Sequence, residues 1–434
     1  MKIYIIGLIG FMLFSCTNSA IEFNFTPGSQ VDIREYNGKW TLYRNNEPYF
    51  IKGAHGRVRL DWLREIGGNS IIVYESELSD SIMNLAHDLG LTVSISLEIG
   101  KGRFEDYTDD EFIHQQRNRV KELVETYKTH PALLFWIVGN ELHITQNNNV
   151  RLWREVNELS KIIRSIDPWH PTTTTIASFP TVLFQPLQIK LFAPDLDFIT
   201  LTIYEFAPRI KRESDSFIWG INGPFLVSEW GGQPYWMYPR TEWDAIIEHS
   251  TTRNADLFYH YHSLIFDRNK EKCIGGYVFY WGQKQERTHT VFSLIHEEKH
   301  KTQAFEALQY LWTETFPDNW CPRIDTFYLD GFSGHNFYLQ KEKNYQANIY
   351  AVDPDDDPLT MKWELREEGY YRGKTGGEQE PVTRIIAQSD SVMTYRENFS
   401  FQSPDKTGPY RLFVYVYDNQ NYVASANIPF YVLP

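Results

Sequence analysis

Two glutamates stand where a short apolar run ends. Glu141 follows Phe-Trp-Ile-Val-Gly-Asn, and Glu229 follows Phe-Leu-Val-Ser. Both runs predict buried strands, because they are apolar and bounded by polar or turn residues. A carboxylate at the end of such a strand adds nothing to packing, since desolvating it without a partner costs several kcal/mol. Two carboxylates facing each other across a pocket provide what the hydrolysis of a glycosidic bond requires.

Eight apolar segments that predict strands alternate with segments of helical periodicity between residues 49 and 318. This alternation predicts an α/β fold, a (β/α)8 TIM barrel over 49–318, with its functional groups at the carboxyl ends of the strands. Helical periodicity is short or missing after strands one and five. A doubly wound open sheet is the alternative, but no glycine-rich phosphate turn follows an early strand. We expect the strands at 49–54, 70–74, 91–97, 133–138, 172–177, 198–203, 225–227 and 274–280.

The barrel is flanked by two segments of β-pattern. Residues 21–48 predict a hairpin lead-in around Asn37-Gly38, a strong type I′ turn signal. Residues 322–434 carry period-two segments separated by turn residues, which predicts a C-terminal all-β immunoglobulin-like sandwich. The acidic stretch 353–358 lies between two of its strands and is either a calcium loop or an acidic turn. We favour the turn, because the glycine and the distant bidentate glutamate of a calcium loop are missing.

Residues 1–20 predict a processing segment rather than part of the fold. Lys2 is followed by an apolar run over 3–14 that is too short to span a membrane comfortably. The sequence Leu13-Phe14-Ser15-Cys16 resembles a bacterial lipoprotein signal, which implies lipidation of Cys16. An ordinary secretory signal with a chance cysteine is the alternative. We therefore expect an extracytoplasmic protein on a bacterial membrane, the outer membrane favoured, facing the periplasm or the cell surface. Whether Cys273 and Cys321 pair cannot be read from their spacing.

Composition excludes some classes of partner. The net charge of −14 argues against nucleic acid, and 16% aromatic residues favour a sugar site weakly. The stretch His296-Glu297-Glu298-Lys299-His300 matches the H-E-x-x-H zinc-protease pattern, but no apolar helical stripe runs through it. We interpret it as a charged turn, and we expect neither a metal nor a cofactor. Membrane contact is expected only through the N-terminal lipid anchor.

Asn140-Glu141 after the fourth strand, with Glu229 at the seventh, resembles the clan A retaining glycoside hydrolases, including families 2 and 5. The segment 47–54 is similar to the start of the family 2 barrel, and the resemblance covers about 47–315. It implies that Glu141 is the general acid/base and Glu229 the nucleophile, with carboxyls about 5–5.5 Å apart and retention of anomeric configuration. It also implies that Asn140 holds the sugar 2-hydroxyl.

Several other residues are candidates for the substrate site. By the same resemblance, Tyr204 orients the nucleophile, Trp281 forms the aromatic floor of the first subsite, and Arg57 matches an arginine near the nucleophile with a shifted register. Their positions after strands one, three and seven make His55, Glu98 and Trp236 further candidates. Glu98 is equally compatible with a salt bridge to a loop, and Trp236 with packing beneath one. Tyr235 and Tyr238 share the alternatives of Trp236.

The whole pattern predicts a retaining β-glycoside hydrolase that cleaves a β-linked polysaccharide or oligosaccharide by double displacement. A β-glucan is the favoured substrate, with mannan and galactan as the other possibilities. The alternatives are a glycan-binding lipoprotein of the same fold without catalysis, and a transglycosidase that shares the covalent intermediate.

Overall fold

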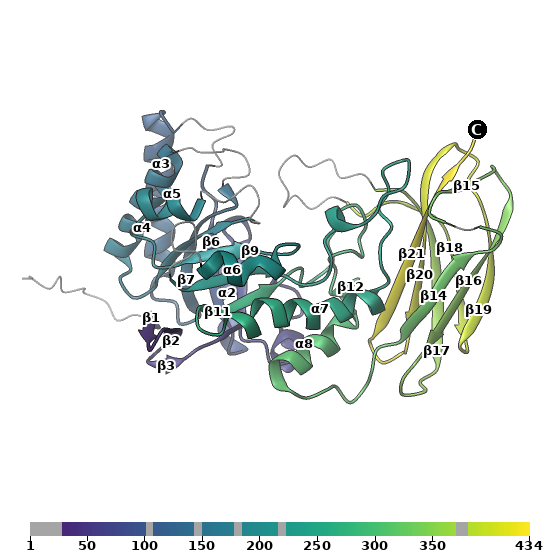
Figure 1. Cartoon of the computed structure of the whole chain (residues 1–434), viewed down its shortest axis with the longest axis horizontal. Helices are drawn as coiled ribbons and strands as arrows, with labels where there is room; N and C mark the ends of the chain where they lie inside the picture. The colour runs from purple at the N-terminus through teal and green to yellow at the C-terminus, as the bar shows by residue number, and fades with distance from the viewer. Residues whose placement is uncertain are drawn as a thin grey trace, which may run out of the picture.

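The computed structural model describes residues 28–100, 107–142, 150–177, 185–215, 223–332, 334–369 and 381–434. The predicted signal segment with Cys16 lies outside these residues, as does His143 beside the first glutamate. Figure 1 shows the chain as two bodies along its long axis: a barrel with its helices on one side and a β-sandwich on the other. Helices α7 (Thr251–Ile265) and α8 (Ala304–Thr313) lie between them.

The barrel is closed and parallel, and it contains all eight predicted strands. Its strands follow one another around the barrel in chain order, with β11 pairing β4 to close it. The predicted α/β barrel is therefore confirmed. The strands are β4 (Ile51–His55), β5 (Ser70–Tyr74), β6 (Thr92–Leu97), β7 (Leu133–Asn140), β8 (Thr172–Ile176), β9 (Ile199–Thr202), β10 (Phe225–Trp230) and β11 (Cys273–Val278).

Helices follow the strands around the outside of the barrel. Those after the first and fifth strands are short, six and eight residues, which explains the weak helical periodicity at these two places. The longer helices bury apolar side chains on one face, as amphipathic segments do. Besides α7 and α8, the helices are α1 (Leu60–Glu65), α2 (Asp80–Asp88), α3 (Asp110–Tyr127), α4 (Val150–Ile166), α5 (Gln185–Phe192) and α6 (Ile210–Asp215).

The C-terminal sandwich consists of a three-stranded sheet, β14-β16-β19, and a five-stranded sheet, β15-β21-β20-β17-β18. Buried side chains from both sheets form its separate apolar core. The predicted all-β domain is confirmed. Its strands are β14 (Arg323–Leu329), β15 (Phe337–Leu339), β16 (Asn344–Val352), β17 (Leu359–Glu367), β18 (Ile385–Met393), β19 (Arg396–Gln402), β20 (Gly408–Tyr417) and β21 (Val423–Val432).

A three-stranded sheet precedes the barrel: β1 (Val31–Tyr36), β2 (Lys39–Arg44) and β3 (Glu47–Pro48). Strands β1 and β2 pair with Tyr36 opposite Lys39, so Asn37 and Gly38 form the predicted two-residue turn. Both turn residues have positive φ, 51° and 78°, as a type I′ turn requires.

The H-E-x-x-H segment is a hairpin and not a helix. Strands β12 (Ile295–His296) and β13 (His300–Lys301) pair so that His296 lies opposite His300. This is the predicted turn, and among the described residues the two histidines belong to no cluster with metal-ligand spacing. Cys273 and Cys321 are buried and unpaired.

The barrel and the sandwich are joined by polar and aromatic contacts as well as by the chain. His289 Nε2 lies 2.7 Å from the hydroxyl of Tyr415, and the ring of His296 stacks on Tyr415 at 4.6 Å. Arg411 of β20 donates to the carbonyl of Ile246 at 2.9 Å. The loop that follows β11 therefore packs directly on the five-stranded sheet.

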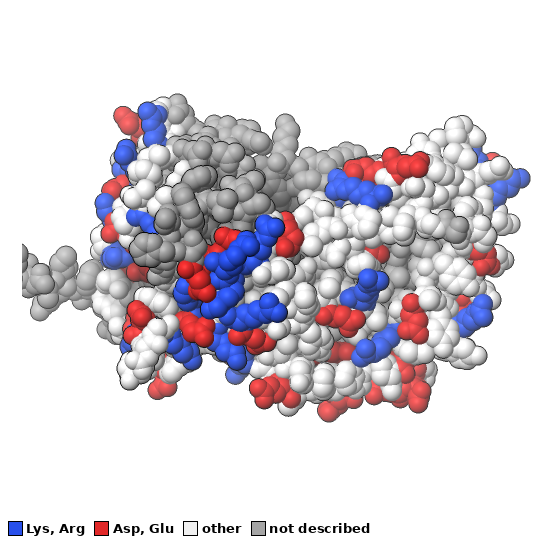
Figure 2. All heavy atoms as spheres, viewed as in Figure 1, with Lys and Arg blue, Asp and Glu red and all other residues white. Residues whose placement is uncertain are grey.

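None of the described helices is long and apolar enough to cross a membrane. On the face drawn in Figure 2, acidic and basic side chains are interspersed, and acidic groups gather along the lower margin beneath α8 and the sandwich.

Candidate active site

Glu141 lies in the turn that ends β7. Gly139 and Glu141 both have positive φ, 81° and 52°, so the chain bends sharply as it leaves the strand. The backbone N–H of Glu141 donates to the carbonyl of Thr175 on the neighbouring β8 at 3.0 Å. A left-handed conformation is uncommon for a residue with a side chain, so this geometry fixes the direction in which the carboxylate leaves the backbone.

Glu229 lies near the carboxyl end of β10. Its carbonyl accepts from the N–H of Ile203 at 3.0 Å, and the β9–β10 register shifts between Val227 and Glu229. Its side chain is 13% exposed. The strand therefore holds this largely buried carboxylate at the carboxyl end of the barrel.

The two glutamates act on each other electrostatically. Burial, followed by the negative charge of Glu141, raises the pKa of Glu229 to about 8. Burial and the charges of both glutamates also raise the pKa of Tyr74 and of Tyr204 well above the ordinary value. Both tyrosines therefore lie within the field of both carboxyls, and the pair holds a proton at neutral pH.

Aromatic side chains from the first and second strands form one wall of the site. His55 Nδ1 lies 3.7 Å from Glu229 Oε1, and the His55 ring tilts against Tyr74 at 4.9 Å. Burial lowers the pKa of His55 to about 3, with Lys284 as the second cause, so this imidazole is neutral and forms no ion pair. Asn140 donates from Nδ2 to the hydroxyl of Tyr74 at 3.2 Å, which fixes its amide beside Glu141.

Tyr204 and Phe279 line the site near Glu229. The hydroxyl of Tyr204 is buried and makes no hydrogen bond of regular geometry among the described residues, yet it lies close enough to Glu229 to lower the pKa of that carboxyl. Phe279 packs edge-on against His55 at 5.2 Å and belongs to the same aromatic cluster as Tyr204. These positions match the predicted orienting tyrosine and supply an aromatic side chain that the sequence interpretation missed.

Trp281, predicted as the aromatic floor, is 0% exposed. Its ring packs on Phe305 at 4.7 Å and its indole N–H donates to the carbonyl of Val58 at 2.8 Å. The ring therefore has no exposed face on which a sugar could lie. Strand β11 ends at Val278, and Phe279, directly after it, packs on His55, which lies beside Glu229. The apolar run continues to Trp281, three residues past the end of the strand, so the sequence does not mark where the strand ends.

Arg57 and Glu98 point to other partners. Arg57 is half exposed and pairs with Glu77 at 3.8 Å, so it does not supply the cation that was expected beside Glu229. Glu98 accepts hydrogen bonds from the hydroxyl and the backbone N–H of Ser76, so it holds this loop through hydrogen bonds rather than through the salt bridge that was one of its two alternatives.

Lys284 supplies the positive charge that Arg57 was expected to supply. It lies on the loop after β11, is almost fully buried, and pairs with Glu286 at 3.0 Å. Its charge lowers the pKa of Glu229. A lysine in a loop that has no strand or helix pattern gives no sequence signal, and only the folding of this loop over the barrel reveals it.

Trp236 lies at the rim of the site. It belongs to the short turn η5 (Tyr235–Met237) after β10, and its ring meets Tyr204 edge-on at 5.5 Å. Its indole N–H donates to Glu205 at 3.1 Å, and 43% of the residue is exposed. An exposed aromatic face beside buried carboxyls suits stacking on a sugar ring. Tyr238, two residues on, is instead buried.

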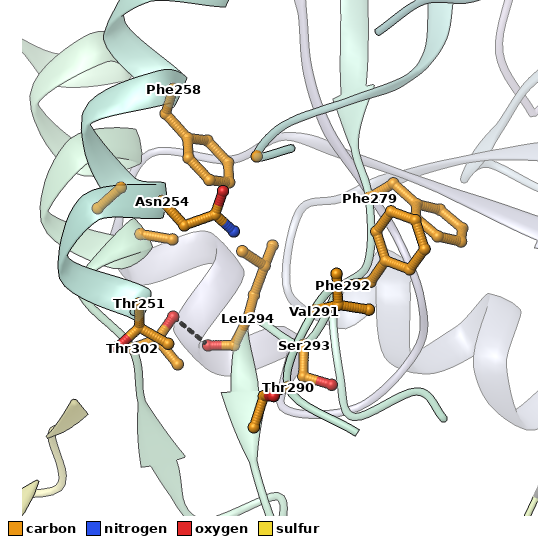
Figure 3. A pocket seen from close by; sticks show the side chains of 13 residues that line it. Thr251, Asn254, Phe258, Phe279, Thr290, Val291, Phe292, Ser293, Leu294 and Thr302 are labelled. Atoms are coloured by element: carbon orange, nitrogen blue, oxygen red, sulfur yellow. Dashed lines mark hydrogen bonds between the residues drawn. The ribbon is translucent and has the colours of Figure 1, made fainter. Parts of the chain in front are cut away.

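Figure 3 shows a pocket next to the site, between α7 and the segment 290–294. Phe258 and Asn254 of α7 face Phe279 and Phe292 across it, and Thr302 donates to the carbonyl of Leu294 at 2.9 Å. Neither glutamate lines it. Phe279, Val291 and Phe292 of the aromatic cluster line this pocket.

The chain resembles known carbohydrate-active proteins. It is 24% identical over 233 residues to mannan endo-1,4-β-mannosidase F of Aspergillus clavatus, covering 48% of this chain and 52% of the relative. It is 21% identical over 282 residues to mannan endo-1,4-β-mannosidase A of Aspergillus aculeatus, covering 58% and 68%. The chain thus spans between about half and two thirds of the length of these relatives. No protein-family model matches it.

Solved structures of glycoside hydrolases share the fold. Bacteroides uniformis β-glucuronidase 2, covalently bound to cyclophellitol-6-carboxylate aziridine, gives a TM-score of 0.52 at 13% identity over 93% of this chain and 48% of that one. A family 2 β-galacturonidase from Eisenbergiella tayi, bound to galacturonate, gives 0.52 at 17% identity over 66% and 55%. The barrel with an added β-sandwich is therefore an architecture found in family 2 glycoside hydrolases.

Proposed function

We propose that this protein is a retaining β-glycoside hydrolase in which Glu229 is the nucleophile and Glu141 the general acid/base. The observation that carries the proposal is the mutual effect of two carboxyls at the ends of β7 and β10, inside a wall of tyrosine, histidine and phenylalanine. Similarity to mannosidases in sequence and to family 2 enzymes in fold supports it.

The reaction proceeds in two displacements. Glu229 attacks the anomeric carbon while Glu141 gives its proton to the departing glycosidic oxygen, which leaves a covalent glycosyl-enzyme. Glu141, now a base, takes a proton from water, and that water releases the sugar with its original configuration. The mechanism needs carboxyls about 5–5.5 Å apart, which remains a prediction.

The resting site must hold one proton, on Glu141. Burial and the charge of Glu141 raise the pKa of Glu229, whereas Lys284 and the hydroxyl of Tyr204 lower it, which favours the arrangement in which the shared proton lies on Glu141. The negative charge so placed makes a proton on Glu141 more favourable, because like charges in a dry site cannot both persist. Lys284 and Tyr204 thereby give two chemically identical carboxyls different tasks.

We propose a β-mannan as the first substrate to test. The sequence alone favoured β-glucan, whereas the curated relatives are mannan endo-1,4-β-mannosidases. Asn140, fixed by Tyr74, would hold the hydroxyl next to the anomeric centre, and Trp236 would stack on a ring at the rim. We also propose that Cys16 carries a lipid that anchors the mature chain outside the cytoplasm.

The experiment is an activity profile of the mature chain on β-mannan, β-glucan, β-galactan and aryl β-glycosides, with proton NMR of the first product. Early release of the β-anomer is expected. Release of the α-anomer would contradict the double displacement. A chain that binds glycan but cleaves none of these substrates would favour the glycan-binding alternative, and a predominance of longer oligosaccharides would favour transglycosylation.

A further inference from the structure

Three aspartates meet at one end of the sandwich. Asp353 follows β16, Asp357 precedes β17, and Asp418 follows β20. Each contributes a carboxylate oxygen, and these oxygens all lie within 4.8 Å of one another. Strand β16 belongs to one sheet and strands β17 and β20 to the other. The cluster therefore forms where the two sheets of the sandwich come together.

Asp353 has a buried oxygen that nothing satisfies. Its Oδ1 accepts from the backbone N–H groups of Asp355 and Asp357 at 2.9 and 3.2 Å. Its Oδ2 is fully buried and has no hydrogen-bond partner among the described residues. The residue as a whole is only 8% exposed. A buried carboxylate oxygen without a partner costs free energy, so this atom calls for a ligand.

Asp418 and Asp357 are oriented by polar neighbours that leave room for a ligand. Asp418 is 1% exposed; its Oδ1 accepts from two backbone N–H groups, and its Oδ2 accepts only from Asn319, at 2.7 Å. Asp357 accepts from Gln420 at Oδ2. A carboxylate oxygen offers two lone pairs, so unused acceptor capacity remains on all three residues.

No side-chain cation neutralises these three carboxylates within the part of the chain that the structure describes. None of its ion pairs includes Asp353, Asp357 or Asp418. The pKa of Asp353 is raised by burial, and the charges of Asp357 and Asp418 add to the effect. Like charges gathered around an unpartnered oxygen repel one another unless a cation lies between them.

We propose that Asp353, Asp357 and Asp418 bind a calcium ion. All the donors are oxygens, with neither imidazole nor thiolate among them, which suits a hard cation and disfavours zinc. Backbone carbonyls of the loop and water would complete the six to eight ligands that calcium takes. This site is independent of the proposed hydrolase activity. The loop sequence alone favoured a turn, because the glycine and the bidentate glutamate of a calcium loop are missing; Asp418, from a distant part of the chain, joins the loop only in the folded structure.

The ion would stiffen the junction between the barrel and the sandwich. Asn319, which follows α8 of the barrel, donates to Asp418, and the N–H of Trp320 donates to Asp355 of the same loop at 2.6 Å. A cation on Asp418 would therefore fix the connecting segment 319–321 as well as three strand ends.

The test is calcium titration of the chelator-treated mature chain by calorimetry, with thermal unfolding in calcium, in magnesium and in EDTA. We expect saturable binding of about one ion per chain and an unfolding midpoint several degrees higher in calcium than in EDTA, since a ligand that binds only the folded state stabilises it. Asp353→Asn and Asp357→Asn should each weaken binding about tenfold or more. The matched control is Asp390→Asn, an exposed aspartate on β18, which should bind as the wild type does.

Absence of calcium binding by a folded wild-type chain would overturn the proposal, as would equal binding by Asp357→Asn and the control. Equal stabilisation by magnesium would overturn the assignment to calcium. If Asp353→Asn fails to fold, the more exposed Asp357→Asn provides the decisive measurement. Cleavage of glycoside does not enter these outcomes, so failure here and failure of the proposed activity are separate results.

Discussion

The barrel and the sandwich each bring carboxylates together, and they deal with the shared charge differently. Glu141 and Glu229 meet among aromatic rings, and burial raises the pKa of Glu229 to about 8, so a proton relieves the repulsion. Asp353, Asp357 and Asp418 meet among backbone N–H groups, which stabilise charged carboxylates. Burial raises the pKa of Asp353, but the backbone donors oppose this, and a cation would relieve the repulsion without a proton.

The difference teaches that proximity alone does not define the chemistry of an acidic cluster. A dry aromatic wall favours a carboxyl that can gain and lose a proton, which catalysis needs. A ring of backbone donors favours permanent anions, which suit metal binding. Substitutions in the two clusters should therefore have separable effects.

The largest effect is expected for Glu229→Gln, which removes the proposed nucleophile with little change of shape. We expect kcat to fall about 10,000-fold or more on aryl β-glycosides, as for the loss of other nucleophiles. Glu271→Gln, an exposed glutamate at the opposite end of β11, is the matched control and should keep wild-type activity. Asp357→Asn should also keep wild-type activity at temperatures below its unfolding midpoint. A comparable loss of kcat in Asp357→Asn would contradict the expectation that the two clusters have separable effects. A comparable loss in Glu271→Gln would show that the effect is not specific to Glu229.

Glu141→Gln should have a smaller effect that depends on the leaving group. General acid catalysis contributes about 100- to 10,000-fold, and an aryl group that leaves without a proton needs little of it. We expect a large loss on mannan and a much smaller loss in the glycosylation of an activated aryl glycoside, measured as a burst of phenol. Equal losses on both substrates would indicate that Glu141 is not the acid.

Trp236→Ala tests how much an uncharged aromatic side chain at the rim of the site contributes to substrate binding. Because the ring is 43% exposed and edge-on to Tyr204, its loss should raise KM about tenfold and change kcat little. Steady-state kinetics on oligosaccharides of increasing length measure this. Trp281→Phe is the comparison, and it should act through stability, since Trp281 is wholly buried.

The smallest effect concerns stability. The folded-state pKa of Glu229 is about 8, above its ordinary value of 4.5. Between these values the unfolded chain releases a proton that the folded chain keeps, so this group lowers stability as the pH rises from about 4.5 to about 8. Glu229→Gln should therefore unfold a few degrees above the wild type at pH 8, with the difference shrinking towards pH 4.5. A difference independent of pH would show that the pair of glutamates does not keep a proton over this range.

The barrel was predictable because its strands are fully buried, and continuous apolar runs mark such strands clearly. The sandwich was harder. Strands β14 and β19 carry exposed residues at alternate positions, and their sequences, such as Arg323–Leu329, have no continuous apolar signal. Strand β18 is mostly exposed, and the period-two segment that the sequence offers, residues 382–387, covers only its start.

In the site, residues directly attached to strand ends could be predicted, as Glu141, Glu229 and Tyr204 illustrate. Their roles remain part of the proposal. Residues carried by loops could not, because a loop has no period from which its direction can be read. Lys284 was missed for this reason, and Arg57 and Trp281 were given roles that their surroundings do not support. Cys16 and the lipid anchor stay predictions.

The stacking of His296 on Tyr415 has a consequence for protein engineering and for evolution. The loop that carries Lys284 to the glutamates continues through His289 and His296, and both histidines rest on the sheet of the sandwich. The sandwich therefore helps to fix the conformation of the loop that carries Lys284, and it belongs to the structural support of the site. A barrel excised at residue 318, or grafted to a foreign module, would lose the surface that shapes this loop. We therefore expect the barrel and the sandwich to occur together in related proteins, and an engineered transfer of the site should include both.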